Sequence, residues 1–190
     1  MIASTSAAFF DEKYQRDADP WNFKKSEYEQ GRDSVLVSEL GGRIYSRAFE
    51  PGCSIGVLTA LLAPHCKSLE AIDISARAVQ LTRQRCRQLR HVRASCGSLR
   101  TGIPGGMFDL IVFSEIGYYF TEEELGGLAE SLVRQLEKRG TFLAVHWLGT
   151  SRDHLLSGDR VHEILRAIGG LHLNHEARYE AFRMDRWERL

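Results

Sequence analysis

The chain has 190 residues, a length typical of one domain and too short for two full-sized ones. Hydrophobic residues make up 43% of it and charged residues 26%, which is the composition of a globular protein and excludes a wholly disordered one. Lys plus Arg and Asp plus Glu both number 25, so the formal net charge is zero. Because binding to nucleic acid or to an anionic membrane draws on a basic surplus, we expect neither as a partner.

Cysteine spacing and the lack of a long apolar run indicate a cytoplasmic protein. The four cysteines form no CxxC pair and have no metal-ligand spacing to a histidine. The N-terminal residues lack the charged and then apolar pattern of a signal peptide, and no segment reaches the roughly 18 apolar residues of a membrane span. We therefore expect reduced thiols, no bound metal and a cytoplasmic location.

The N-terminal part of the chain differs in pattern from the rest. We expect residues 1–16 to form an arm, the first eight of them frayed, ahead of a single domain over residues 17–190. Residues 17–23 are expected to form a loop, because Pro20 disfavours a helix at the residue before it. Apolar residues then recur on one side of a helix predicted over residues 26–40, which a pair of glycines ends.

Farther along the chain, predicted strands alternate with predicted helices. This alternation indicates βαβ units, and therefore an α/β fold with a mainly parallel sheet and helices on both faces. Residues 171–190 alternate in polarity, which predicts a hairpin that adds an antiparallel last strand. Gly140 marks the turn before the fifth strand. Strands are predicted at 44–50, 68–74, 91–96, 108–114 and 141–147, and helices at 54–63, 75–89, 121–137 and 157–168.

The first predicted strand-to-helix turn is rich in small residues, and an aspartate ends the second strand. Glycines such as Gly52 and Gly56 let the backbone approach a ligand and leave the helix N-terminus facing it, although a tight turn alone also explains them. Asp73 follows the second strand, at the sheet edge where open α/β sheets bind ligands. A carboxylate there is placed to accept hydrogen bonds from ribose hydroxyls. Together these features predict a nucleoside site.

The residue before the turn distinguishes between nucleoside cofactors. A dinucleotide site prefers GxGxxG with a pyrophosphate at the helix N-terminus, and Glu50 would oppose that pyrophosphate. An acidic residue suits a cofactor with a cationic end. S-adenosylmethionine carries a sulfonium and an ammonium and no phosphate, so it is the expected cofactor. A dehydrogenase linked to NAD is the rival interpretation.

These motifs resemble those of class I S-adenosylmethionine-dependent methyltransferases. The resemblance lies in residues 50–56 (EPGCSIG), Asp73, residues 108–115 (FDLIVFSE) and Gly140 before TFLAV. Residues 17–190 are more closely similar to the nodulation protein S group of small-molecule N-methyltransferases. That similarity is carried by Asp19-Pro20-Trp21, Tyr28-Glu29, Arg32, residues 61–75 (LLAPHCKSLEAIDIS) and residues 114–120 (SEIGYYF).

The resemblance implies a fold, a reaction and an acceptor. The fold would be a Rossmann-like, doubly wound, mainly parallel seven-stranded sheet with an antiparallel last strand. The enzyme would leave S-adenosylhomocysteine as product after methylating a small molecule, and in that group the acceptor is the free amine of a deacetylated chitooligosaccharide. We expect a monomer or homodimer. An O-methyltransferase of a small metabolite and a non-catalytic cofactor-binding protein on the same fold are alternatives.

The same resemblance assigns cofactor contacts residue by residue. Asp73 would hold the ribose, Glu50 would order the loop or reach the ammonium through water, and Arg32 would pair with the cofactor carboxylate. Ser54 replaces the usual middle glycine, and Ser98 stands where many relatives have an aspartate for adenine. The remaining expected cofactor contacts are Gly52, Cys53, Gly56, Ile74, Gly97, Leu99 and Ser114.

Methyl transfer requires a nucleophile held about 3 Å from the methyl carbon, and an amine must lose a proton before it attacks. Glu115, Tyr118 and His146 are the candidate catalytic residues, because they follow or end buried strands and could take that proton. Each could equally be part of the core. The candidate substrate-binding residues are Trp21, Tyr28, Tyr118, Tyr119 and His146.

Overall fold

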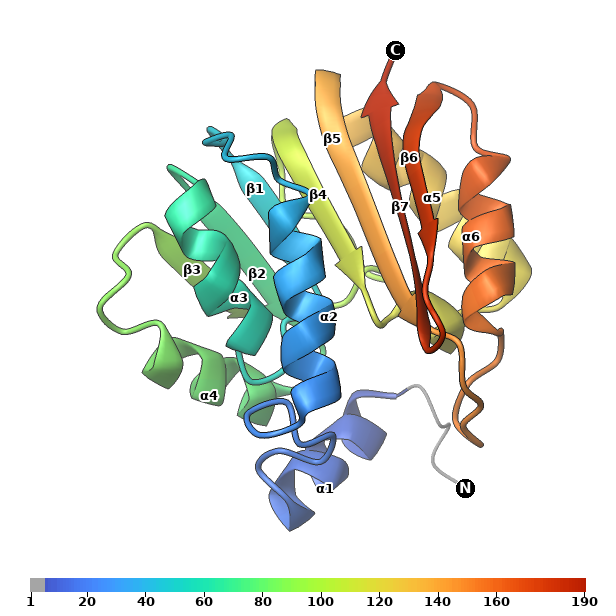
Figure 1. The fold of residues 1–190 in the computed structure, drawn as a ribbon. Coiled ribbons are helices and arrows are strands. Elements are labelled where there is room, and N and C mark those ends of the chain that lie inside the picture. The colour runs from blue at the N-terminus through green and yellow to red at the C-terminus, as the bar shows by residue number, and fades with distance from the viewer. Residues whose placement is uncertain (1–5) are drawn as a thin grey trace. The chain divides into compact units, whose positions relative to one another are not determined.

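The computed structural model describes residues 6–190, which form two compact units (Figure 1). The first unit ends at Ser98 and the second covers Leu99–Leu190. The first contains helices α1 (Ala7–Arg16), α2 (Glu27–Ser38), α3 (Val57–Leu62) and α4 (Ala76–Arg85), the short 3-10 helix η1 (Ala63–His65) and strands β1 (Ala48–Pro51), β2 (Leu69–Asp73) and β3 (Val92–Cys96).

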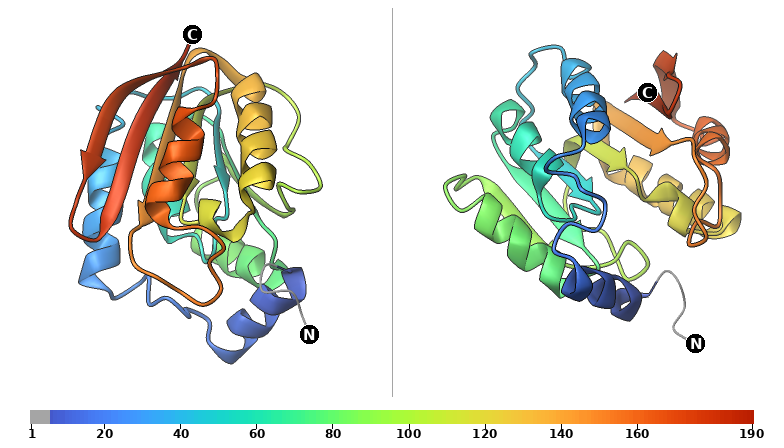
Figure 2. Two further views of the ribbon diagram at one scale, coloured as in Figure 1. Left: turned by 90° about the vertical axis from the view of Figure 1, so that its right-hand side faces the viewer. Right: turned by 60° about the horizontal axis from the view of Figure 1, so that its bottom comes forward.

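The first unit is built on a parallel sheet in the order β3-β2-β1. Residue Ala48 pairs with Leu69, and Leu69 in turn pairs with Val92. All four residues of β1 are buried, and α4 covers β2 and β3 (Figure 2). The hydroxyl of Ser75 accepts a hydrogen bond from Ala78 N (3.2 Å) and so caps the start of α4. The parallel strands and their crossover helices confirm this part of the predicted fold.

Two predicted elements of the first unit begin later than expected. The strand predicted over 44–50 starts at Ala48, because Tyr45 makes only an isolated bridge to Cys66. The helix predicted over 54–63 starts at Val57, because its N-cap Gly56 has the left-handed φ of 76° and residues 52–56 form a loop. The loop is therefore longer, and the helix shorter, than the apolar pattern predicted.

The N-terminal arm contains a helix that the sequence interpretation missed. Residues 1–5 lie outside the described part of the chain, but Ala7 and Ala8 begin α1, so the predicted fraying of that stretch is wrong there. The hydroxyl of Ser6 accepts from Phe9 N at 3.2 Å and caps the helix. Tyr14 is buried against the rest of the unit, and this tertiary packing stabilises a helix of 10 residues that is too short to be stable by itself. The division into an arm and a single domain over 17–190 stays a prediction.

The second unit combines a parallel strand pair with an antiparallel hairpin, in the order β4-β5-β7-β6. Strand β4 (Phe108–Ser114) runs parallel to β5 (Leu136–Trp147), and β7 (Phe182–Arg189) pairs antiparallel with both β5 and β6 (Leu171–Arg178). Helices α5 (Glu122–Gln135) and α6 (Gly158–Arg166) pack on each other and on β5 (Figure 2). Every residue of β4 is buried, as its apolar run predicted.

Strand β5 is longer than predicted, and Gly140 does not form the expected turn. The strand begins at Leu136 and continues through Gly140. Arg139 has a left-handed φ of 64°, and the pairing register shifts between Phe108 and Leu110, which is the pattern of a β-bulge. A glycine fits here because an added Cβ would lie 2.7 Å from the carbonyl oxygen of Glu137. The glycine therefore marks a bulge inside a strand.

The strand inventory confirms the predicted fold class. Residues 6–190 contain seven strands, with three parallel pairs (β1 with β2, β2 with β3, β4 with β5) and antiparallel strands toward the C-terminal end. The hairpin predicted over 171–190 is present as β6 and β7. Within residues 6–190, no helix is long and apolar enough to cross a membrane.

Candidate functional site

The loop of residues 52–56, which we call the glycine loop, leads from β1 into α3. Three of its residues have left-handed φ values: Gly52 (79°), Ser54 (50°) and Gly56 (76°). The amides of Gly52 and Cys53 both donate to the carbonyl oxygen of Ile72, at 2.7 and 3.0 Å. A Cβ added to Gly56 would lie 2.8 Å from Thr82 Cγ2, so only glycine fits there. The backbone of the loop is thus held close to β2 and α4.

Side chains from neighbouring elements fix the conformation of the glycine loop. The hydroxyl of Thr82 donates to the Ser54 carbonyl oxygen (2.7 Å), and Arg85 Nε donates to the Ile55 carbonyl oxygen (2.9 Å). The phenol of Tyr14 donates to Ser54 Oγ at 2.6 Å. Ser54, which stands where a glycine was expected, therefore adopts a strained φ that its surroundings impose, a combination that often marks functional sites.

Cys53 lies within the loop with its side chain turned into the core. Its thiol is buried, and Sγ lies 3.7 Å from the hydroxyl oxygen of Thr82. Burial raises the pKa of this thiol well above its ordinary value, with the charges of Asp73 and Glu50 adding to the shift. A neutral, buried thiol is a packing group, so the loop presents backbone rather than a reactive sulfur at this position.

Asp73 joins the end of β2 to the glycine loop. Its Oδ2 accepts from Ser54 N (2.8 Å) and its Oδ1 accepts from Ser75 N (2.9 Å). Burial raises the pKa of this carboxyl to about 6, although hydrogen bonds from the backbone of Ser75, Ser54 and Ile74 oppose the shift. A carboxylate offers about four acceptor positions, so not all of them are occupied and a further donor can bind. The Asp73 carbonyl oxygen accepts from Gly97 N (2.9 Å), which brings the ends of β2 and β3 together.

The residues expected along an adenine ring divide between the two units. Ile74, Gly97 and Ser98 follow β2 and β3 in the first unit and are half-buried. An added Cβ on Gly97 would be 3.8 Å from Ile72, an ordinary contact, so Gly97 is not sterically required. Leu99 is buried and begins the second unit.

Glu50 is a carboxyl group sealed inside the first unit. It is 2% exposed at the end of β1. Burial raises its pKa to about 8; an interaction with Thr59 opposes the shift, and the nearby carboxylates of Asp33 and Asp73 add to it. Among residues 6–190, its Oε2 is buried without a hydrogen-bond partner. A cation placed beside Glu50 would lower its pKa and supply a partner for that oxygen.

Arg32 and Tyr28 lie together on α2. Arg32 is 3% exposed, and its Nη2 lies 2.6 Å from Glu29 Oε2 and 3.0 Å from Asp33 Oδ1. The ring of Tyr28 is 5.9 Å from the guanidinium carbon. Burial raises the pKa of Asp33, although Arg32 opposes the shift. The predicted pairing of Arg32 with a cofactor carboxylate stays a prediction.

Trp21 belongs to an aromatic cluster at the N-terminal end of the first unit. Its ring lies 5.5 Å from that of Tyr14 and 5.7 Å from that of Phe23, and Lys13 Nζ lies 4.8 Å from its centroid. The cluster packs on Ile55 of the glycine loop. The arm is thus held against the loop by aromatic packing, and the role of Trp21 toward a substrate stays a prediction.

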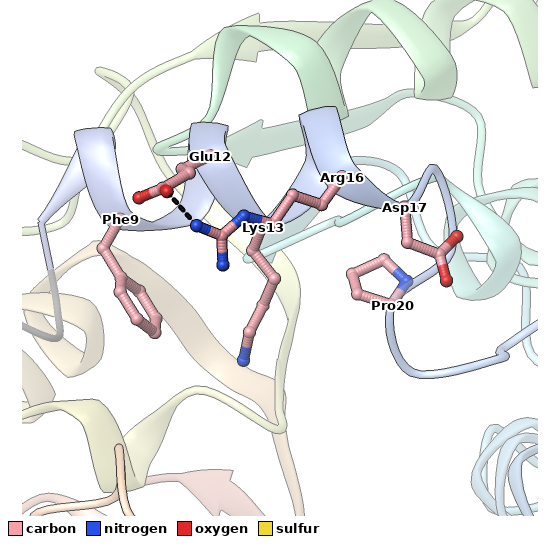
Figure 3. Close-up of a pocket in the computed structure, with 6 residues that line it drawn as sticks. All are labelled: Phe9, Glu12, Lys13, Arg16, Asp17 and Pro20. Atoms are coloured by element: carbon pink, nitrogen blue, oxygen red, sulfur yellow. Dashed lines mark hydrogen bonds and ion pairs between the residues drawn. The ribbon is translucent and has the colours of Figure 1, made fainter.

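A surface pocket on α1 lies apart from the predicted site residues. Its lining includes charged side chains of both signs, and Glu12 forms an ion pair with Arg16 across it. Figure 3 shows Phe9 and Lys13 projecting from the same side of the helix. None of the predicted cofactor or substrate residues lines this pocket, which is formed by Phe9, Glu12, Lys13, Arg16, Asp17 and Pro20.

The second unit gathers the other predicted residues in the turn that follows β4. Glu115 has a left-handed φ of 59°, and its carboxylate accepts from Trp147 N (2.8 Å) through Oε1 and from the Tyr118 phenol (2.7 Å) through Oε2. The ring of Tyr118 stacks on that of His154 with centroids 3.6 Å apart, and Tyr119 packs against both. The strained Glu115 and the Tyr118 phenol form one hydrogen-bonded pair.

Ser114 and His146 are buried at the ends of β4 and β5. Ser114 is the last residue of β4 and pairs with Val145. His146 is fully buried; its Nε2 accepts from Gly117 N (3.0 Å) and its Nδ1 lies 3.2 Å from His162 Nε2. Both ring nitrogens of His146 are therefore engaged inside the unit. Its assigned roles in catalysis and substrate binding stay predictions.

Sequence reasoning missed several residues that shape these two regions. Tyr14 and Thr82 fix the glycine loop, and His162 with Asp185 continues the buried chain that begins at His146. They lie on α1, α4, α6 and β7, far from the motifs in sequence.

Comparisons with known proteins agree with this architecture. The family model for Nodulation protein S (NodS) matches residues 9–164. A nodulation protein S from Sinorhizobium fredii (strain NBRC 101917 / NGR234) is 36% identical over 105 residues, covering 55% of this chain and 49% of that protein. One from Rhizobium tropici is 32% identical over 142 residues, covering 71% and 56%. The chain thus spans about half the length of the curated relatives it matches.

A solved structure reproduces the fold over nearly the whole chain. The crystal structure of N-methyltransferase NodS from Bradyrhizobium japonicum WM9, in complex with S-adenosyl-L-homocysteine, superimposes with a TM-score of 0.85 at 23% sequence identity. The match covers 97% of this chain and 98% of that one. At this identity the likeness concerns the fold.

Proposed function

Because the chain belongs to the nodulation protein S family, we propose that it is an S-adenosylmethionine-dependent methyltransferase that methylates an amine of a small molecule. The observation that carries the proposal is the arrangement of Glu50, the glycine loop and Asp73 within the first unit. These groups meet at the ends of β1 and β2, the edge where open α/β sheets bind nucleosides.

The residues present fit an adenosyl cofactor with a cationic end. Asp73 has acceptor positions left for ribose hydroxyls, and the buried Oε2 of Glu50 can face a positive charge directly or through water. The left-handed glycine loop, with no room for a Cβ at Gly56, lets backbone approach the amino-acid portion. A pyrophosphate beside Glu50 would raise its pKa further and would supply no cation for Oε2, which disfavours NAD.

When bound, S-adenosylmethionine supplies a methyl group that its sulfonium has already activated. The chain must then bring an uncharged amine to that carbon and exclude water. Within the second unit, Glu115 accepts a hydrogen bond from Tyr118 and is half-buried, so it is a carboxylate able to take a proton from an ammonium. Tyr118 orients that carboxylate through its phenol.

For the acceptor, we propose the free amine of a deacetylated chitooligosaccharide. The support is the resemblance of residues 61–75 and 114–120 to the nodulation protein S group and the name N-methyltransferase given to the Bradyrhizobium japonicum protein. A sugar amine is a small, neutral-to-cationic group, which agrees with a chain of zero net charge.

The test is a methyl-transfer assay with a partly deacetylated chitooligosaccharide and S-adenosylmethionine. We expect S-adenosylhomocysteine to form in step with a product carrying one added methyl group on nitrogen, detected by mass spectrometry. The fully acetylated oligosaccharide is the matched control and is expected to stay unmodified. Methylation of that control would indicate O-methylation, and cofactor binding without turnover of either sugar would contradict the proposed reaction.

A further inference from the structure

A buried chain of polar groups crosses the second unit and links four of its elements. Gly117 N in the 3-10 helix η2 (Gly117–Tyr119) lies 3.0 Å from His146 Nε2 of β5, and His146 Nδ1 lies 3.2 Å from His162 Nε2 of α6. His162 Nδ1 lies 2.8 Å from Asp185 Oδ2 of β7. His146, His162 and Asp185 are all 0% exposed. Water therefore does not determine how their protons are arranged.

The geometry fixes the direction of every hydrogen bond in this chain. A backbone N–H can only donate, so His146 Nε2 accepts from Gly117 and carries no proton. The single proton of a neutral His146 then resides on Nδ1 and is donated to His162 Nε2. His162 in turn carries its proton on Nδ1 and donates it to Asp185. Both rings are thus in the Nδ1–H tautomer.

Arg183 binds Asp185 at the other end of this chain of buried polar groups. Its Nη2 lies 3.0 Å from Asp185 Oδ2, and its Nε donates to the same carboxylate. Burial alone would raise the pKa of Asp185, but the hydrogen bonds from His162 and Arg183 outweigh it and lower that pKa. Asp185 is therefore an ionised, accept-only group, as the tautomer assignment requires.

The His146 end of this chain of buried polar groups contacts the turn that carries Tyr118. A Cβ added to Gly117 would lie 2.8 Å from His146 Nε2, so the turn approaches the imidazole closely. The next residue, Tyr118, holds Glu115 through its phenol, and its carbonyl oxygen accepts from Leu155 N (2.7 Å). The position of the Tyr118–Glu115 pair therefore depends on the hydrogen bond between Gly117 and His146.

We propose that His162 and Asp185 are positioning residues, which act through His146 to hold the Gly117–Tyr118 turn and with it the Tyr118–Glu115 pair. The link to catalysis rests on the proposed function, whereas the arrangement of protons stands without it. The network holds the Gly117–Tyr118 turn in place because each donor in it has one defined acceptor.

Protonation of His162 would reverse this arrangement. His162 would then donate from Nε2 to His146 Nδ1, which moves the His146 proton to Nε2 and sets two N–H groups, those of His146 and Gly117, against each other. The charged and titratable groups that face His162 are Asp185 and Arg183 on β7, His146 on β5 and Asp159 on its own helix. Burial, the largest effect, lowers the pKa of His162, so the neutral arrangement is the one present near neutral pH.

The first test measures ring tautomers in the wild-type chain by long-range ¹⁵N–¹H correlation spectra near neutral pH, without cofactor or acceptor. We expect His146 and His162 both to show a protonated Nδ1 and an unprotonated Nε2, a tautomer that free histidine disfavours. A protonated Nε2 on either ring would overturn the proposal. Because no methyl transfer is needed, this result is independent of whether the proposed function holds.

The second test compares His162→Gln with His172→Gln, which replaces an exposed histidine of β6. We expect exchange of the Gly117 amide hydrogen to quicken by about tenfold or more in His162→Gln, as for loss of one buried hydrogen bond, and to stay unchanged in the control. In the methyl-transfer assay, kcat should fall while the KM for S-adenosylmethionine stays within about twofold. Unchanged Gly117 exchange in folded His162→Gln would overturn the proposal, and if that variant fails to fold, the wild-type tautomers decide.

Discussion

The glycine loop after β1 and the turn after β4 both follow a buried parallel strand, yet they are built differently. In the glycine loop the backbone itself is left-handed at Gly52, Ser54 and Gly56, and side chains from α1 and α4 hold that backbone in place. The turn after β4 takes its shape from side chains, because Glu115 accepts from Trp147 N and His146 accepts from Gly117 N. Glycines in the local sequence permit the conformation of the loop, whereas the turn depends on side chains that are distant in the chain.

The difference explains where each region tolerates change. The glycine loop is sensitive to any added side chain, because its backbone packs so closely on β2 and α4 that no space is left for new atoms. A turn built by side chains is sensitive to the loss of one donor or acceptor in a buried network. Four substitutions test these expectations, and their expected effects differ in size.

The largest effect is expected from Gly56→Ala. The new Cβ would lie 2.8 Å from Thr82 Cγ2 at a φ of 76°, so steric overlap adds to left-handed strain. We expect a loss of about 2–5 kcal/mol of unfolding free energy, measured by urea denaturation. The control is Gly31→Ala in α2, where a Cβ meets nothing within 4 Å and helix propensity should stabilise by about 0.5–1 kcal/mol. Equal effects of the two changes would contradict this close packing of the glycine loop.

Glu50→Gln should change how stability depends on pH. The folded pKa of Glu50 is raised from 4.5 to about 8, so the folded state keeps this proton and wild-type stability falls as pH rises through that range. Relative to wild type, the unfolding free energy of the variant should rise by on the order of 2–3 kcal/mol between about pH 6 and about pH 9.

The control for this pH series is Glu27→Gln, at an exposed position of α2. Thermal or urea unfolding over the same pH series measures both variants. A difference in unfolding free energy between wild type and Glu50→Gln that stays flat with pH would show that Glu50 is not a buried, protonated carboxyl.

Asp73→Ala tests the link between the glycine loop and ligand binding. Asp73 holds Ser54 N and has acceptor positions left for a ribose, so its loss should weaken S-adenosylhomocysteine binding by about 1.5–3 kcal/mol, measured by calorimetry. Unchanged affinity in a folded variant would remove Asp73 from the site.

The smallest effect is expected from Tyr118→Phe. The change removes one phenolic hydrogen bond to Glu115 and keeps the ring that stacks on His154. We expect about 1 kcal/mol less stability, a lower rate of methyl transfer, and unchanged affinity for S-adenosylhomocysteine. Tyr179→Phe, at an exposed tyrosine of the second unit, is the control and should alter none of these. A Tyr118→Phe enzyme with the wild-type rate of methyl transfer would show that Glu115 does not need the hydrogen bond from the Tyr118 phenol.

The same contrast explains what could be predicted from the sequence. The alternation between strand-like and helix-like hydrophobic patterns predicted the strands and helices. Strand β4 was predicted with its observed bounds because a fully buried strand is a continuous apolar run. The glycine loop and Asp73 were visible because residue type reports backbone conformation locally. Gly140 was misassigned, because a glycine in a β-bulge looks like one in a turn.

The residues that sequence could not reveal act across elements. Nothing near His162 or Asp185 in the sequence signals that they meet, because their pairing depends on how α6 packs on β7. Helix α1 was missed for a similar reason, since the burial of Tyr14 and the cap by Ser6 stabilise a helix that is too short to be stable by itself.

The most direct test of the central claim is isothermal titration of the full chain with S-adenosylhomocysteine, with NAD titrated in parallel. We expect saturable heat at one site per chain for S-adenosylhomocysteine, reduced by Asp73→Ala, and none for NAD. Saturable binding of NAD, or no binding of S-adenosylhomocysteine to folded protein, would contradict the central claim.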